Sequence, residues 1–84
     1  MVQGQDRAFL SPALCRAARG LLDWTQGDLA RHADVSRSTV RDFEGERHDI
    51  HRSTGAQLLR AFEEHSVAFV SIEGVGPAVC LKNR

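Results

Sequence analysis

Apolar residues recur at helical spacing in several stretches of the chain, and each stretch predicts a helix with one buried face. The first stretch begins at Ser11 and Pro12, because a capping residue followed by proline suits the start of a helix. Its apolar positions are Leu14, Ala17, Ala18, Leu21 and Leu22. Trp24 follows this helix and is expected to pack in the core between helices.

Two short helices joined by a tight turn are predicted between residues 26 and 45. Thr25 is a favourable N-cap for the first, because Asp28 can complete a capping box with it. Ser36 is a favourable N-cap for the second. The buried sides are formed by Leu29 and Ala30 in the first helix and by Val40 and Phe43 in the second. This arrangement is a helix-turn-helix unit, which is typical of DNA-binding proteins.

The second of these helices has a polar side opposite its apolar residues. Projection at about 100° per residue separates Val40 and Phe43 from four polar residues. These four are Arg37, Ser38, Arg41 and Asp42. Arginine can donate to both major-groove acceptors of guanine, serine can pair with several bases, and aspartate can accept from the cytosine amino group. We therefore expect these residues to contact DNA bases; the alternative is an ordinary solvated face.

The segment from Gln26 to Gly45 resembles the Cro and phage-repressor regulators of the XRE family. The spacing from Gln26 to Glu44 follows the family pattern, and the closing glycine comes one residue early. The matching positions are Gln26, Leu29, Ala30, Asp34, Val35, Ser36, Val40, Glu44 and Gly45. The resemblance covers roughly residues 11–65 and implies a four-helix, lambda-repressor-like helix-turn-helix domain.

The resemblance also implies contacts with DNA. It places Gln26 against a phosphate and against the base of the next helix. It takes the positions of Arg37, Ser38 and Asp42 to base edges, whereas Arg41 is added by helical projection alone. Further phosphate contacts are expected from Thr39, Arg47 and His48.

Two features of the resemblance concern the framework of the domain. The family pairs an arginine of the first helix with the glutamate that closes the third, which here implies an ion pair between Arg19 and Glu44. Such a pair would hold the third helix in place. Asp34 stands where the family usually has glycine with a positive φ angle. Aspartate tolerates this conformation better than most residues, so we expect the turn to form with some strain.

A fourth helix is predicted after the polar loop of residues 47–52. Ser53 is expected to cap this helix, because serine at an N-cap can accept a hydrogen bond from a backbone N–H of the first turn. Leu58, Leu59 and Phe62 are expected to face inward, since their spacing places them on one side. This helix would close the globule.

A β-hairpin is predicted from two apolar runs, residues 67–72 and 78–81, that flank a Gly-Val-Gly-Pro turn. Alternation in the first run puts apolar side chains on both faces, and water would cover neither comfortably. One face is expected to pack on the helices, and the other, or an open edge, to meet a second copy. Burial under the fourth helix is the alternative. The residues assigned to the dimer interface are Val67, Phe69, Val70 and Ile72.

The length of 84 residues fits one small, mainly α domain. We expect an N-terminal extension at 1–10, the helix-turn-helix domain at 11–65 and the C-terminal β-hairpin at 66–84. Basic and acidic residues balance at 11 each, so DNA binding is expected to depend on base contacts and dimerisation more than on salt-sensitive attraction. No apolar run approaches a membrane span and the start is too polar for a signal peptide, which predicts a cytoplasmic protein.

No enzyme chemistry and no cofactor are predicted, since no nucleophile has a base at a recognisable spacing and no cofactor fingerprint is present. His48 and His51 lie three residues apart, but no carboxylate or cysteine completes a metal-ligand set with them, so no metal is expected. Cys15 and Cys80 lack CxxC spacing and are expected to be reduced, partly buried thiols.

The expected function is that of a sequence-specific transcriptional regulator, a repressor that binds an inverted repeat in double-stranded DNA as a homodimer. The alternative is an antitoxin-type protein that masks a toxin through the hairpin and represses its own operon. A third alternative is a coactivator or scaffold that keeps the fold without reading bases. Arg37 and Arg41 argue against this third alternative.

Overall fold

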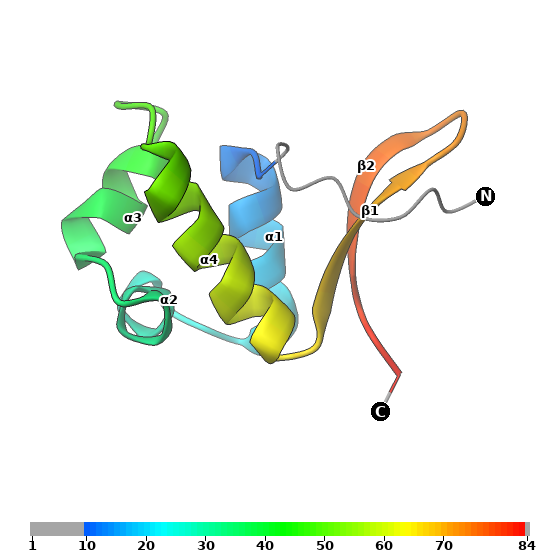
Figure 1. Ribbon diagram of the computed structural model, residues 1–84, viewed down its shortest axis with the longest axis horizontal. Helices are drawn as coiled ribbons and strands as arrows, with labels where there is room; N and C mark the ends of the chain where they lie inside the picture. The colour runs from blue at the N-terminus through cyan, green and yellow to red at the C-terminus, as the bar shows by residue number, and fades with distance from the viewer. Residues whose placement is uncertain (1–9, 84) are drawn as a thin grey trace.

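The computed structural model describes residues 10–83, which form four helices followed by a two-stranded antiparallel hairpin (Figure 1). The elements are α1 (Pro12–Leu22), α2 (Gln26–Ala33), α3 (Arg37–Glu44), α4 (Arg52–Glu64), β1 (Val67–Ile72) and β2 (Gly76–Leu81). The predicted mainly helical layout with a C-terminal hairpin is confirmed. The extension expected at residues 1–10 lies, except for Leu10, outside the described residues. No helix in the described part is long and apolar enough to cross a membrane.

Side-chain caps begin the first three helices, as the sequence predicts. Ser11 caps α1. At the start of α2, Thr25 Oγ1 accepts from the Asp28 N–H at 2.9 Å, and the Asp28 carboxylate accepts from the Thr25 N–H at 2.9 Å. The capping box is therefore complete. Ser36 Oγ accepts from the Thr39 N–H at 3.1 Å and starts α3.

The start of α4 differs from the prediction. The helix begins at Arg52 with His51 at the N-cap position, and Ser53 lies inside the first turn, so the expected Ser53 cap is wrong. The Gly55 N–H already donates to the His51 carbonyl at 3.0 Å, so the helical hydrogen bonds start before Ser53. His51 itself makes no side-chain capping bond.

The turn between α2 and α3 is closed by a residue in the left-handed region. Asp34 has a φ angle of 60°, as the family resemblance implies for this position. Its N–H and that of Val35 return to the last turn of α2, the latter bonding to the Ala30 carbonyl at 3.0 Å. These bonds satisfy carbonyls at the helix end and make the change of direction tight.

The core lies between the helices and one face of the hairpin. The largest fully buried side chains are Cys15, Leu29, Val40, Leu58, Phe62 and Val67. The prediction for α1 was partly wrong, because Ala17 and Leu21 are exposed. The buried side of α1 is formed by Cys15 and Ala18, one helical turn apart.

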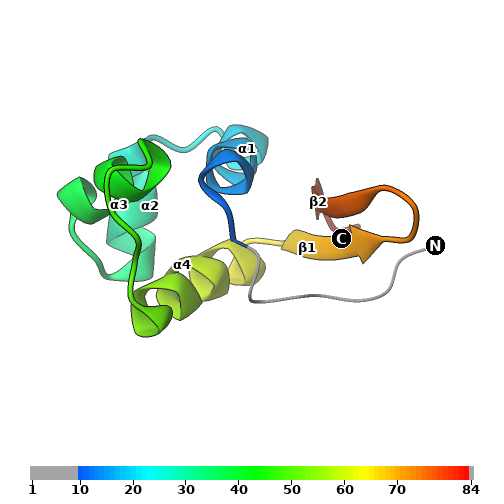
Figure 2. The same ribbon diagram turned by 90° about the horizontal axis from the view of Figure 1, so that it is seen from above.

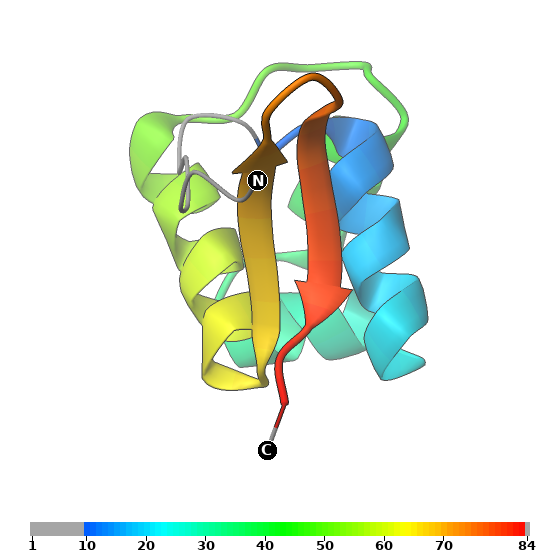
Figure 3. The same cartoon turned by 90° about the vertical axis from the view of Figure 1, so that its right-hand side faces the viewer.

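The hairpin packs across two helices, with β1 against α4 and β2 against α1 (Figure 3). Seen from above, α2 and α3 lie at the opposite end of the molecule from the hairpin (Figure 2). Phe69 pairs with Val79 across the strands, and both pack on the core. The Phe69 ring centroid is 5.7 Å from that of Phe62 in α4. The C-terminal hairpin is therefore part of the fold.

Two of the residues assigned to the dimer interface belong to this core. Val67 is 0% exposed and Phe69 is 4% exposed, so neither offers surface to a second chain. The reason is that their face of β1 packs on the helices of the same chain, as was expected for one face of the hairpin. Val70 and Ile72 point to the other face and are half-buried.

We expect Asp34→Gly to raise the free energy of unfolding by up to about 1 kcal/mol, because glycine adopts a positive φ angle without the steric cost of a β-carbon. Asp34→Ala is the matched control and should lower it, since alanine lacks this freedom. Denaturant unfolding of the three proteins measures both effects. A glycine variant less stable than the parent would show that the aspartate side chain offsets its own strain.

Candidate nucleic-acid interface

A buried carboxylate at the end of α3 joins three helices. Glu44 is 4% exposed. Arg19 of α1 forks onto it, with Nε donating to Oε2 and Nη2 donating to Oε1, both at 2.7 Å. Gln26 of α2 donates from Nε2 to Oε1 at 3.0 Å, and the Cys15 thiol donates to Oε2 at 3.1 Å. This is the ion pair that the family resemblance implies, with two further donors.

Backbone contacts extend this Glu44 network, defined as Cys15, Arg16, Arg19, Gln26 and Glu44. Arg16 donates from Nη1 to the Glu44 carbonyl, and Arg19 donates from Nη1 to the Trp24 carbonyl at 2.9 Å. The sequence analysis missed Cys15 and Arg16 as members. Their signal was helical spacing, because they precede Arg19 by four and three residues and share its side of α1.

Opposing effects set the protonation of the network. Burial alone would raise the pKa of the Glu44 carboxyl, but the hydrogen bonds from Arg19, Gln26 and Cys15 and the charge of Arg19 outweigh it, so the pKa lies below its usual value. Burial raises the pKa of the Cys15 thiol, and the hydrogen bond and charge of Glu44 raise it further. Glu44 therefore stays ionised and Cys15 stays a protonated donor at neutral pH.

The polar side of α3 faces out of the molecule, as predicted. Arg37, Ser38 and Arg41 are exposed, while Val40 and Phe43 on the opposite side are buried. Arg41 is drawn toward the half-buried Asp42, with Nε 3.4 Å from Oδ1. An exposed contact of this length contributes little to stability, so the guanidinium can turn to another partner. The helix thus presents two cations and one carboxylate on one side.

Three hydroxyl groups gather at the start of α3. Ser36 Oγ lies 3.1 Å from Ser38 Oγ and 2.7 Å from Thr39 Oγ1. Ser38 was expected at a base and Thr39 at a phosphate, and the structure joins both to the N-cap. Each hydroxyl has a donor and two acceptor positions, so sharing one bond leaves capacity for a further partner.

The other residues expected to contact phosphates lie in two parts of the structure. Gln26 is half-buried and its amide donates to Glu44, so its side chain belongs to the network that orients α3. Arg47 and His48 are exposed in the loop after α3. His48 borders a hollow of about 200 Å³ whose lining includes Thr39 and Asp42, so the loop and α3 form one continuous surface.

Trp24 and two histidines form an aromatic cluster at the junction of α2 and α4. The Trp24 ring stacks on His32 at 4.4 Å with 3° between the planes and meets the edge of His65 at 4.8 Å. Trp24 packs against the core, as predicted. Among residues 10–83, no three His, Cys, Asp or Glu side chains gather into a metal site.

Both cysteines are free, but only one is buried. Cys15 is fully buried, whereas Cys80 is exposed near the end of β2, so the expectation of a partly buried thiol is wrong there. Cys80 pairs with Ala68 and shares its face of the hairpin, the face turned away from the helices.

No protein-family model matches the chain, and no curated protein is similar enough to match it.

We expect Glu44→Gln to lower the free energy of unfolding by about 3 kcal/mol at neutral pH, because it leaves the Arg19 guanidinium without its partner charge. The folded state holds the pKa of Glu44 below its usual value, so its stabilisation is complete above the unfolded pKa of about 4.3 and is lost as pH falls through the lower folded value. The parent should therefore lose more stability than Glu44→Gln in acid.

Denaturant unfolding between about pH 6 and pH 3 measures this difference. Asp28 also has a lowered pKa, because the Thr25 N–H donates to its carboxylate, and it titrates in the same direction. Both proteins should therefore carry Asp28→Asn as a common background. Equal acid losses with and without Glu44 would contradict the assignment.

Proposed function

We propose that this protein is a sequence-specific, DNA-binding transcriptional regulator in which α2 and α3 form a helix-turn-helix unit. The observation that carries the proposal is the exposed polar side of α3, with Arg37, Ser38 and Arg41 held on a helix whose other side is buried. In this proposal α3 lies in the major groove and its arginines donate to guanine, while Asp42 accepts from cytosine. Regulation then proceeds by binding, without catalysis or a cofactor.

The Glu44 network supports this proposal because base reading requires a fixed helix. The forked bond from Arg19 and the bond from Gln26 tie the end of α3 to α1 and to the start of α2. A side chain that must meet a base edge is effective only where packing and hydrogen bonds hold its backbone. In our proposal Gln26 also meets a phosphate, as do Thr39, Arg47 and His48.

The equal numbers of basic and acidic residues affect which contacts supply the DNA affinity that we propose. The chain has 11 basic and 11 acidic residues, so its overall attraction to phosphates is modest. Base contacts and the joining of two half-sites must then supply more of the affinity than in a strongly basic protein. We place the protein in the cytoplasm as part of this proposal.

We propose that two copies pair through the outer face of the hairpin, defined as Val70, Ile72, Ala78 and Cys80. No charged residue lies on this face. An antiparallel strand pair that packs on a core commonly has polar residues on its solvent face, so an uncharged outer face is unusual. The helix α3 lies at the other end of the molecule (Figures 1 and 2), so its exposed polar side stays free in such a dimer. A two-fold pair of α3 helices fits an inverted repeat, with half-sites about 34–36 Å apart or a multiple of that distance.

The same outer face also supports a second candidate function. An apolar, uncharged strand pair can be covered by a different protein, as in an antitoxin that masks a toxin and represses its own operon. The two candidates differ in solution, since the regulator pairs with itself and the antitoxin stays open until its partner is present. Both use α3 on DNA.

Arg37→Ala is expected to abolish sequence preference, because the lost guanine fork costs about 1–3 kcal/mol at each half-site while phosphate contacts remain. A preferred duplex is first selected from a random library with the parent protein. Parent and variant are then titrated against that duplex and a scrambled one. Arg60→Ala, an exposed arginine of α4, is the control and should keep the preference. Unchanged discrimination by Arg37→Ala would mean that α3 does not read bases.

Val70→Glu is expected to give a folded monomer, because it places a charge in the centre of the outer face without touching the core. Sedimentation at tens of micromolar should show a dimer for the parent and half its mass for the variant. Val75→Glu adds the same charge at the turn, where the side chain is 78% exposed, and should stay dimeric. A monomeric parent, or a dimeric Val70→Glu, would remove the hairpin interface from the proposal.

A further inference from the structure

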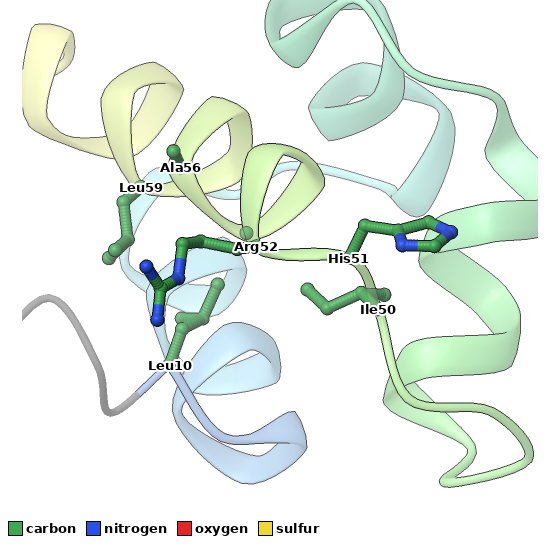
Figure 4. Close-up of a pocket in the computed structure, with 7 residues that line it drawn as sticks. Leu10, Ile50, His51, Arg52, Ala56 and Leu59 are labelled. Atoms are coloured by element: carbon green, nitrogen blue, oxygen red, sulfur yellow. The ribbon is translucent and has the colours of Figure 1, made fainter.

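A groove of about 530 Å³ lies at the start of α4, apart from the polar side of α3 (Figure 4). Its principal lining residues are Leu10, Ile50, His51, Arg52, Ala56 and Leu59. We call it the α4 groove. Its volume falls within the range of about 300–1,000 Å³ that is usual for sites that bind small molecules. Four of these six side chains are apolar, which is the composition of a site for a hydrocarbon body.

One charged side chain lies across this apolar surface. Figure 4 shows the Arg52 guanidinium between the side chains of Leu10 and Leu59, whereas the His51 ring points away from them toward α3. None of the ion pairs among residues 10–83 includes Arg52. The groove therefore combines apolar walls with a guanidinium that has no ion-pair partner within residues 10–83.

Gly55 of α4 also lines the groove. Gly55 lies in the first turns of the helix, where glycine costs about 0.5–1 kcal/mol relative to alanine. A β-carbon at this position would lie 3.4 Å from Ile50 Cδ1, in ordinary van der Waals contact with this lining residue of the groove. A methyl group at position 55 would therefore occupy part of the groove beside Ile50.

We propose that the α4 groove binds a small apolar monocarboxylate. The carboxylate would accept two hydrogen bonds from the planar Arg52 guanidinium, a geometry that matches the two groups. The hydrocarbon body would lie against Leu10, Ile50 and Leu59. A free phosphate would leave these walls in water, and an amine would face a like charge, so neither suits the groove. The proposal does not depend on DNA binding.

The α4 groove shares a wall with the α3 surface. Ile50 and His51 line the groove and also the hollow beside Thr39 and Asp42. A bound carboxylate would therefore contact the segment that borders the polar side of α3.

The test uses octanoate as the probe and the full chain as the receptor, with isothermal titration calorimetry for affinity and amide chemical shifts for location. Octanoate should bind saturably and perturb Ile50, Gly55 and Leu59. Octanol should bind at least tenfold more weakly, because it lacks the charge that pairs with Arg52. Absence of saturable octanoate binding, or perturbation centred on the hairpin, would overturn the proposal.

Variants distinguish the contribution of the Arg52 charge to binding from that of the apolar walls. Arg52→Gln should weaken octanoate binding at least tenfold and leave octanol binding unchanged, whereas Arg60→Gln on the same helix should alter neither. Gly55→Ala should weaken both ligands while raising the midpoint of thermal unfolding, which shows that the protein still folds. Equal octanoate affinity for the parent and Arg52→Gln would contradict the assigned role of the guanidinium.

Discussion

The ionised carboxylate of Glu44 is the constraint on which the arrangement of the helices depends. A charge removed from water costs several kcal/mol unless hydrogen bonds and an opposite charge replace its hydration. Arg19, Gln26 and Cys15 supply these bonds, so α1, the start of α2 and the end of α3 must meet at one point. The direction of α3, and with it the polar side that we propose for DNA, follows from this meeting.

The two ends of the molecule have different chemistry. The end formed by α2 and α3 presents arginines and hydroxyls, and the end formed by the hairpin presents an uncharged outer face (Figure 1). The core between them uses Val67 and Phe69 from the inner face of β1. One face of the hairpin therefore completes the helical domain, and the other is the face that we propose for dimerisation.

Much of the local structure could be predicted because it depends on neighbours within four residues. The caps at Thr25 and Ser36 are of this kind, whereas the positive φ angle of Asp34 was expected from the family resemblance. The predicted Ser53 cap is wrong, although it too depends on near neighbours. Both His51 and Ser53 could precede the first turn of α4, and the backbone hydrogen bond from Gly55 to His51 places the N-cap at His51. The residue types at these two positions do not show which of them is the N-cap.

The sequence by itself determined the helices, the caps of the first three, the buried side of α3 and, through family resemblance, the pairing of Arg19 with Glu44. Tertiary structure alone decided which face of the hairpin is buried, because both faces of β1 are apolar and only the position of α1 and α4 distinguishes them. It also decided that Cys15 completes the hydrogen bonding of Glu44, 29 residues away. Periodicity describes one element at a time, whereas these outcomes depend on surfaces that meet only after the elements pack.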